Sequence, residues 1–164
     1  MKKLFAVVIF LLFSLSLAVL ASGQSSKETY RALKKLEAKT QTGISYQDYG
    51  PALGEAKLEI NLFSESPEAK EKPKLKEIFY KTMGHYEEAG NVWGCQFAGR
   101  GPAYNMVPAQ HGGTDSDLIA QVLRTYPKAR FKVDAMGCLP YSEVIKIMWQ
   151  EATNELKKAG PLLK

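Results

Sequence analysis

Apolar positions recur along much of the chain at the three- and four-residue spacing of an amphipathic α-helix. The clearest stretch is residues 45–64, where apolar or aromatic side chains step by 3, 4, 3, 4 and 3 positions (Tyr46, Tyr49, Leu53, Ala56, Ile60, Phe63). Pro51 interrupts this stripe early, so we expect the helix either to begin at Pro51 or to kink there.

Residues 73–92 carry a second stripe of the same kind (Leu75, Phe79, Thr82, Tyr86, Ala89, Trp93). The short charged connection between the two stretches contains Pro67 and Pro73. Two long helices with matched stripes and a short connection predict an antiparallel hairpin.

A third helix is predicted over residues 26–41, with Ser26 as its N-cap and Gly43 at its end. Its apolar face can pack against the hairpin (Tyr30, Leu33, Leu36). Its opposite face is basic (Arg31, Lys34, Lys35, Lys39).

Two further helices are predicted in the second half of the chain. The first begins at Thr114 and stops before Pro127, and its apolar face is a helical stripe (Leu118, Ile119, Val122, Leu123, Tyr126). The second runs over residues 142–159, with Ser142 as N-cap and Gly160 after its end. Its inward face is also apolar (Val144, Ile145, Met148, Trp149, Ala152, Leu156).

Residues 94–113 break the helical pattern with five glycines and two prolines. Because the stretch is also rich in apolar and aromatic side chains, we expect an ordered loop. Residues 129–135 alternate between apolar and polar side chains, which predicts a short strand, and residues 91–97 are its expected partner. The fold class is therefore mainly α: a bundle of four to five helices with a Gly-rich loop and one short β pairing at most.

The N-terminus has the pattern of a secretory signal peptide. Lys2 and Lys3 precede an apolar run over residues 4–20, and small residues follow it. Cleavage is expected after Ala21 or Gly23, which divides the chain into a signal peptide (1–23) and one helical domain (24–164). The style of the signal indicates a bacterial protein that is periplasmic or secreted. In the alternative, an uncleaved anchor tethers the protein, and the basic first helix rests on the membrane.

Composition and charge exclude few classes of protein function. The chain has 164 residues, 45% of them hydrophobic and 24% charged, with a formal net charge of +5. Lys2 and Lys3 carry two of these charges, which leaves about +3 after cleavage. A nucleic-acid-binding domain usually has a clustered basic stripe and a stronger bias, so that class is not expected.

The two cysteines, Cys95 and Cys138, are predicted to form a structural disulfide in an oxidising compartment. The bridge would close a loop of about 40 residues and stabilise the fold by about 4 kcal/mol in the chain-entropy model. No Cys-x-x-Cys motif is present, so neither a redox motif nor a covalent haem site is indicated.

Candidate ligand contacts gather in the Gly-rich loop, because loops on a rigid scaffold often carry function. Arg100 lies between two glycines that favour an anion-binding backbone nest. Tyr104 and His111 are the other candidates. No cofactor fingerprint or metal-ligand spacing is present, so no cofactor and no resident metal are expected.

Three other positions receive structural interpretations. His85 is interpreted as a partly exposed boundary residue, against a metal or haem role with Met83 or Met148. Glu87 and Glu88 are neighbours in a helix and do not share a face, so they make a poor catalytic pair.

The leading hypothesis is an exported, non-enzymatic binding or interaction module, with residues 94–113 as its contact region for a small molecule or protein. One alternative is a metal- or thiol-dependent periplasmic enzyme that uses Cys95 and His111. The other is the membrane-tethered helical protein.

Overall fold

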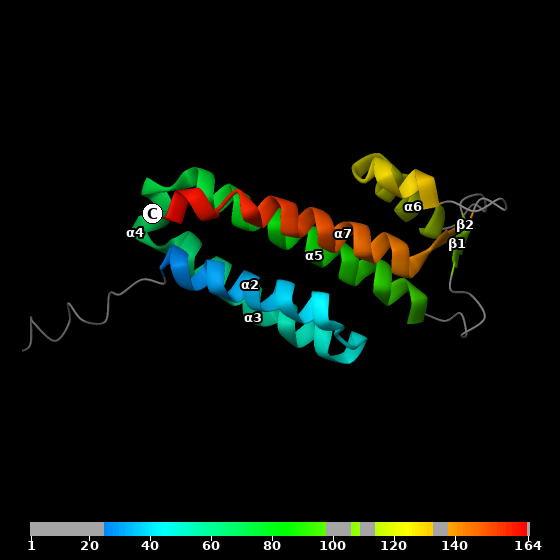
Figure 1. Cartoon of the computed structure of the whole chain (residues 1–164), viewed down its shortest axis with the longest axis horizontal. Coiled ribbons are helices and arrows are strands. Elements are labelled where there is room, and N and C mark those ends of the chain that lie inside the picture. The colour runs from blue at the N-terminus through cyan, green and yellow to red at the C-terminus, as the bar shows by residue number, and fades with distance from the viewer. Residues whose placement is uncertain (1–24, 98–105, 109–113, 133–137, 164) are drawn as a thin grey trace, which may run out of the picture.

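The structure, a computed structural model, describes residues 25–97, 106–108, 114–132 and 138–163 (Figure 1). Side chains are described for residues 25–94, 120–131 and 140–163. Helices dominate the described residues, as predicted. In chain order the elements are α2 (Ser26–Thr42), α3 (Tyr46–Glu65), α4 (Pro67–Glu71), α5 (Pro73–Phe97), β1 (Met106–Pro108), α6 (Thr114–Thr125), η2 (Pro127–Lys132), β2 (Cys138–Pro140), α7 (Tyr141–Lys157) and η3 (Gly160–Leu163).

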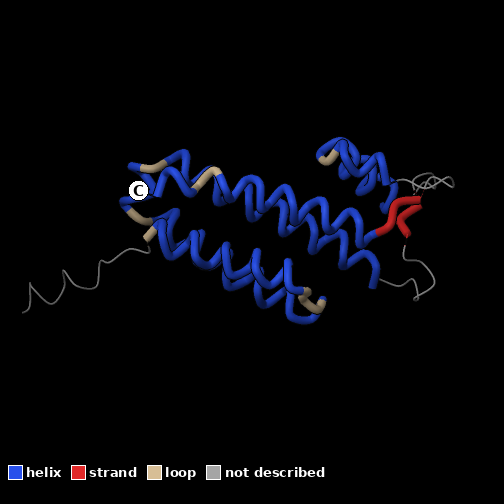
Figure 2. The backbone as a smooth tube through the Cα atoms, viewed as in Figure 1, coloured by secondary structure: helices blue, strands red, loops and turns tan. Residues whose placement is uncertain are grey.

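The long helices α2, α3, α5 and α7 lie side by side and alternate in direction (Figures 1 and 2). α5 packs most extensively against α7, and α3 packs against both α2 and α5. This arrangement confirms the predicted helical bundle and the antiparallel packing of the two striped helices. α6 and η2 stand beside the end of this bundle at which α7 begins (Figure 1).

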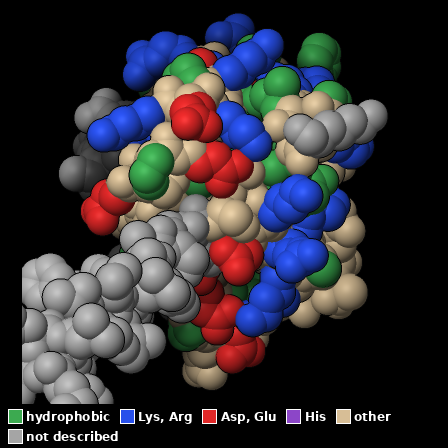
Figure 3. Space-filling model, turned by 90° about the vertical axis from the view of Figure 1, so that its left-hand side faces the viewer, with side chains coloured by type: hydrophobic (Ala, Val, Ile, Leu, Met, Phe, Trp, Pro, Cys, Tyr) green, Lys and Arg blue, Asp and Glu red, His purple; other side chains and the backbone are tan. Residues whose placement is uncertain are grey.

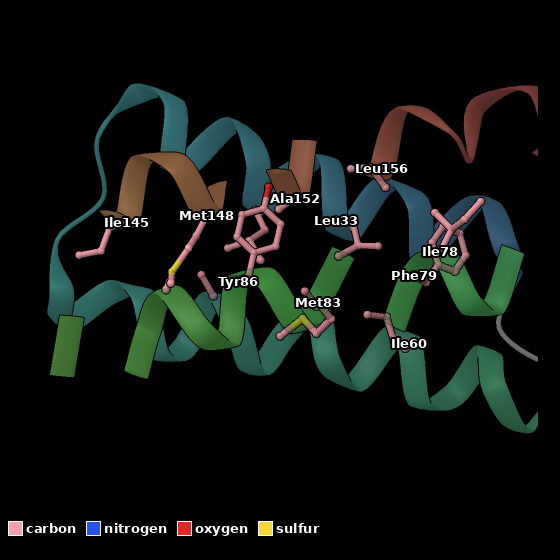
Figure 4. Close-up of a cluster of buried hydrophobic side chains, with 14 of the residues drawn as sticks. Leu33, Ile60, Ile78, Phe79, Met83, Tyr86, Ile145, Met148, Ala152 and Leu156 are labelled. Atoms are coloured by element: carbon pink, nitrogen blue, oxygen red, sulfur yellow. The ribbon is translucent and has the colours of Figure 1, made fainter. Parts of the chain in front are cut away.

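The core consists of the apolar stripes that the spacing predicts. Leu33, Ile60, Tyr86 and Met148, from four different helices, lie between those helices and are at most 2% exposed (Figure 4). Burial of one large apolar side chain stabilises a fold by roughly 1.5–3 kcal/mol. The stripes therefore account for the packing of the four long helices.

The helix ends follow local capping chemistry, with one correction. Ser25, not Ser26, caps α2: its hydroxyl accepts from the Glu28 amide, and the Glu28 carboxylate accepts from the Ser25 amide. Ser26 lies in the first turn and bonds to Glu68 of α4 instead. Gly43 ends α2 at a φ of 95°, a left-handed value that favours glycine.

α3 begins at Tyr46, with Ser45 as its N-cap, and Pro51 lies inside the helix. A helix start at Pro51 is therefore wrong. The Ser45 hydroxyl accepts a hydrogen bond from the Asp48 amide and fixes the earlier start. As a result Tyr46 and Tyr49 belong to the first turns of the helix.

The second half of the chain differs from the expected β pairing. Residues 127–132 form the 3₁₀ helix η2, and residues 91–97 belong to α5, so the predicted strands at these positions are wrong. The buried Ala129 donates its amide to the Tyr126 carbonyl at 2.9 Å, a local bond that outweighs the alternating pattern. The antiparallel pair in the structure joins β1 to β2, with Val107 opposite Leu139.

Three smaller expectations also need correction. The connection after α3 contains the short helix α4, whose N-cap is Ser66. The segment predicted as a loop from residue 94 is helical as far as Phe97. α7 follows β2 directly and begins at Tyr141 after Pro140, without a side-chain cap, so Ser142 is not its N-cap.

None of the helices in the described part of the chain is both long and apolar enough to cross a bilayer.

Candidate functional site

A groove lies between the first turns of α3 and the later turns of α5. We call it the α3–α5 groove. Its volume is about 590 Å³, within the range of roughly 300–1,000 Å³ that is usual for small-molecule sites. Its lining comes from both helices: Tyr46, Gln47, Tyr49, Gly50 and Leu53 from α3, and Glu87, Gly90 and Asn91 from α5.

Tyr49 anchors the buried side of this groove and is 1% exposed. Its hydroxyl donates to the Tyr86 carbonyl at 2.8 Å and accepts from the Trp149 Nε1–H at 2.9 Å. Burial raises the pKa of Tyr49 well above its ordinary range. The ring is therefore held by contacts to α5 and α7.

Aromatic rings continue from Tyr49 in both directions. Trp93 lies 5.5 Å, between ring centroids, from both Tyr46 and Tyr49. Its centroid is 5.7 Å from that of Trp149, in an edge-to-face arrangement. Tyr46, at one end of this cluster, is 39% exposed, so part of its surface is available to a ligand in the groove.

Two glycines shape the groove. A Cβ atom at Gly90 would lie 3.2 Å from a Tyr49 ring carbon and 3.3 Å from a Leu53 methyl, so α5 approaches α3 closely only because residue 90 is glycine. A Cβ atom at Gly50 would meet nothing within 4 Å. A side chain at position 50 would therefore take up space in the groove without disturbing the packing.

The charge at the rim of the groove is internally balanced. Glu87 is the one charged side chain among the described lining residues, and its Oε1 lies 2.6 Å from the Lys57 Nζ. This hydrogen bond and the negative charge of Glu87 raise the pKa of Lys57. The other polar side chains of the lining are the uncharged Gln47 and Asn91 and the tyrosine hydroxyls.

A second polar cluster lies where α6 meets α5. The Tyr126 hydroxyl donates to the Glu88 carboxylate, and His85 Nδ1 lies 2.7 Å from the same hydroxyl. Because the only phenolic proton goes to Glu88, the network assigns the proton of the second bond to His85 Nδ1. Burial, followed by the hydrogen bond to Glu88, raises the pKa of Tyr126 far above its usual range.

The hollow beside this cluster is small. Its volume is about 90 Å³, and its lining includes Glu88, Tyr126 and Asn91, the last of which also lines the α3–α5 groove. Since a water molecule occupies about 30 Å³ of the liquid, this space suits a few waters better than an organic ligand. The Lys128 Nζ lies 2.8 Å from the Glu151 Oε1, and this ion pair joins η2 to α7.

The interpretations of His85 and of the two methionines agree with the structure. His85 is half-buried at the boundary of the bundle, and Met83 and Met148 are core side chains, 3% and 1% exposed. Glu87 forms an ion pair with Lys57 of α3, whereas the Glu88 carboxylate accepts a hydrogen bond from Tyr126. The two carboxylates therefore face different partners, which agrees with the prediction that they do not share a helix face.

The other predicted site residues fall where the structure gives no side chains. Arg100, Tyr104 and His111 lie outside the described residues. The backbone of Cys95 belongs to the last turns of α5 and that of Cys138 begins β2, but both side chains lie outside the described part. Within the part that is described, the structure contains neither a disulfide nor a group of three side chains suited to a metal ion.

The groove itself was not predicted. The sequence pattern places Tyr46 and Tyr49 only in an apolar stripe, and it gives no functional signal for Gln47 or Asn91. The sequence carries a partial signal in the helix-interior glycines 50, 54, 84 and 90, each of which costs up to about 1 kcal/mol relative to alanine, but only Gly50 and Gly90 of these line the groove.

Comparisons of the chain with known protein families, with characterised proteins and with solved structures give no match. The groove and the His85–Tyr126–Glu88 cluster are therefore the features from which a function is argued.

Proposed function

We propose that this chain is an exported, non-enzymatic binding protein whose small-molecule ligand occupies the α3–α5 groove. The observation that carries the proposal is the groove itself, a hollow of about 590 Å³ with aromatic and uncharged polar side chains on its walls. Concave sites of this size and mixed lining are the usual form of small-molecule sites.

The Gly-rich segment 94–113 belongs to the same proposal as a flanking contact region. Gly94 lies beside the groove, because a Cβ atom there would be 3.1 Å from the Tyr46 hydroxyl. The segment also carries the predicted contacts Arg100, Tyr104 and His111, which lie outside the described residues and stay predictions.

The His85–Tyr126–Glu88 cluster favours a structural role over a catalytic one. All three side chains are at least half-buried, and their hydrogen bonds join the α6–η2 region to α5. The adjacent 90 Å³ hollow leaves little room for a substrate.

Ligand binding is tested by ligand-observed NMR with three neutral aromatic probes: indole, catechol and benzamide. At least one should give a saturation-transfer signal with the wild-type protein. Gly50→Leu should abolish that signal, because the new side chain fills the groove. Gly54→Leu is the matched control, since it introduces the same side chain one turn later in α3, also in open space but outside the groove lining.

Both variants should fold, because leucine is the better helix former and neither position has a neighbour within 4 Å of the added Cβ atom. A probe signal that survives Gly50→Leu would contradict the proposed site. So would a wild-type protein that binds neither these aromatic probes nor neutral trisaccharides.

The export part of the proposal is tested by the intact mass of the protein after expression in a bacterial host. Loss of the first 21 or 23 residues supports the predicted signal peptide, and a full-length mass contradicts it. Alkylation without reductant then reports on Cys95 and Cys138: no alkylation at either cysteine supports the disulfide, and alkylation of both argues against it.

A further inference from the structure

We infer that the ligand of the α3–α5 groove is an uncharged saccharide. This inference rests on the proposed function and adds the chemical class of the ligand. It follows from the charge balance of the groove, the kind of polar side chains on its two walls, and the exposed aromatic surface between them.

The charge balance argues against an ionic ligand. Among the lining residues that the structure describes, Glu87 alone is charged, and it is already paired with Lys57 at 2.6 Å. A cation would have to compete with Lys57 for Glu87, and an anion would meet the carboxylate without a counter-charge among the described lining residues, because Lys57 is already paired with Glu87. Because desolvation of an unpaired charge is costly, the groove favours a neutral ligand.

The polar side chains suit hydroxyl groups. Gln47 lies on the α3 wall and Asn91 on the α5 wall, and each amide offers two N–H donors and a carbonyl acceptor. A sugar hydroxyl both donates and accepts, so it can pair with either end of an amide and with the Glu87 carboxylate. A ligand with hydroxyls along two edges can bridge the walls.

The apolar part of the lining suits the face of a sugar ring. Tyr46 is 39% exposed, and Leu53 and Gly50 continue the lining along α3. The face of an aromatic ring carries partial negative charge, and the C–H groups on one face of a pyranose carry partial positive charge. A sugar ring can therefore lie against Tyr46 while its hydroxyls point to the amides.

The walls are already ordered, which lowers the entropic cost of binding. Trp93 holds Tyr46 and Tyr49 at centroid distances of 5.5 Å, and Trp149 fixes the Tyr49 hydroxyl from the other side. Few lining side chains have to be immobilised when a ligand enters. The proximity of Trp93 to Tyr46 also supplies a fluorescent reporter.

The experiment titrates the full exported chain with three neutral trisaccharides: cellotriose, maltotriose and N,N′,N″-triacetylchitotriose. Intrinsic tryptophan fluorescence and isothermal titration calorimetry measure the Kd. At least one sugar should bind saturably. Gly50→Leu should weaken it by at least about tenfold, and Gln47→Ala by about fivefold or more, since each good hydrogen bond contributes about 1 kcal/mol. Gly54→Leu should change the Kd by less than about twofold.

Three outcomes would overturn the inference. If none of the sugars binds while an aromatic probe still binds in the groove, the saccharide class is wrong and the proposed function stands. If a sugar binds equally well to the wild-type protein and to Gly50→Leu and Gln47→Ala, it binds elsewhere, and the inference again fails. If neither sugars nor aromatic probes bind the wild-type protein, the proposed function fails with it.

Discussion

The hydroxyl of Tyr49 donates a hydrogen bond to the backbone carbonyl of Tyr86 across the α3–α5 interface, at 2.8 Å. The same oxygen accepts the indole N–H of Trp149 at 2.9 Å, so one side chain joins α3 to both α5 and α7. Tyr49 also lines the groove. The stability of the bundle and the shape of the α3–α5 groove therefore depend on the same residue.

Tyr49→Phe should destabilise the protein by about 1–3 kcal/mol, because it removes a buried donor and leaves the Trp149 N–H without its acceptor. Urea unfolding measures the change. Tyr80→Phe removes a hydroxyl from a side chain that is 45% exposed and should change the free energy of unfolding by less than about 0.5 kcal/mol. If both substitutions changed the free energy of unfolding by the same amount, the hydrogen bonds of Tyr49 would not stabilise the fold.

Glycine-to-alanine substitutions in α5 should show separately how helix propensity and close helix packing affect the stability of the protein. At Gly84 an added Cβ meets nothing within 4 Å, so Gly84→Ala should stabilise the protein by about 0.5–1 kcal/mol. At Gly90 the added Cβ lies 3.2 Å from Tyr49, and this contact should cancel or reverse the gain. Thermal unfolding of both variants measures the difference. A Gly90→Ala variant as stable as Gly84→Ala would mean that the helices can separate at no cost.

The hydrogen-bond chain at Tyr126 makes a prediction about the tautomer of His85. With Tyr126 donating to Glu88, neutral His85 should carry its proton on Nδ1. Long-range ¹H–¹⁵N correlation spectra at a pH where the imidazole is neutral distinguish the two tautomers. Tyr126→Phe removes the acceptor, and the Nε2–H tautomer should then increase. A tautomer ratio that is unchanged in Tyr126→Phe would rule out this hydrogen-bond chain.

Acid stability should depend on Glu68, which joins α4 to the first turn of α2 at a bundle end where acidic and basic side chains intermingle (Figure 3). Hydrogen bonds from Lys72 and then from Ser26 lower the pKa of Glu68 from 4.5 to about 2. A depressed folded-state pKa stabilises the protein above pH 4.5, and this contribution is lost as the pH falls toward 2.

Glu68→Gln should therefore lower the free energy of unfolding by about 1–2 kcal/mol at pH 7, an amount reduced by partial solvent exposure. The difference from the wild-type protein should disappear near pH 2. Glu71→Gln, at an exposed carboxylate of the same short helix, is the control and should have little effect at either pH. A Glu68→Gln deficit that is independent of pH would point to lost packing instead of lost charge.

The positions of the long helices followed from the sequence because burial repeats every three to four residues in an amphipathic helix. Leu33, Phe63, Phe79 and Leu156 were all assigned to inward faces, and each is at most 1% exposed. The predicted helix ends were less accurate. The N-cap of α2 is Ser25 and not Ser26, and α3 begins before Pro51. A cap depends on hydrogen bonds to particular amides, and several neighbouring serines can satisfy the same pattern.

Residues 127–132 illustrate the limit of a short alternating pattern. Such alternation is compatible with a strand, but a strand is stable only if a partner lies beside it. The expected partner, residues 91–97, continues α5 instead, and the amide of Ala129 bonds to Tyr126. Local hydrogen bonding therefore determined the conformation of this segment.

By itself, the sequence determined that the four long segments α2, α3, α5 and α7 are helical and which of their faces are buried, because both follow from the periodicity of apolar side chains. It also predicts the signal peptide and the disulfide from residues whose side chains the structure does not describe. Only the tertiary structure decided that Gly90 of α5 meets Tyr49 of α3, and so where the groove lies. Periodicity specifies the face that each helix buries, but the side chains of two helices must pack together before the space left between them has a position and a lining.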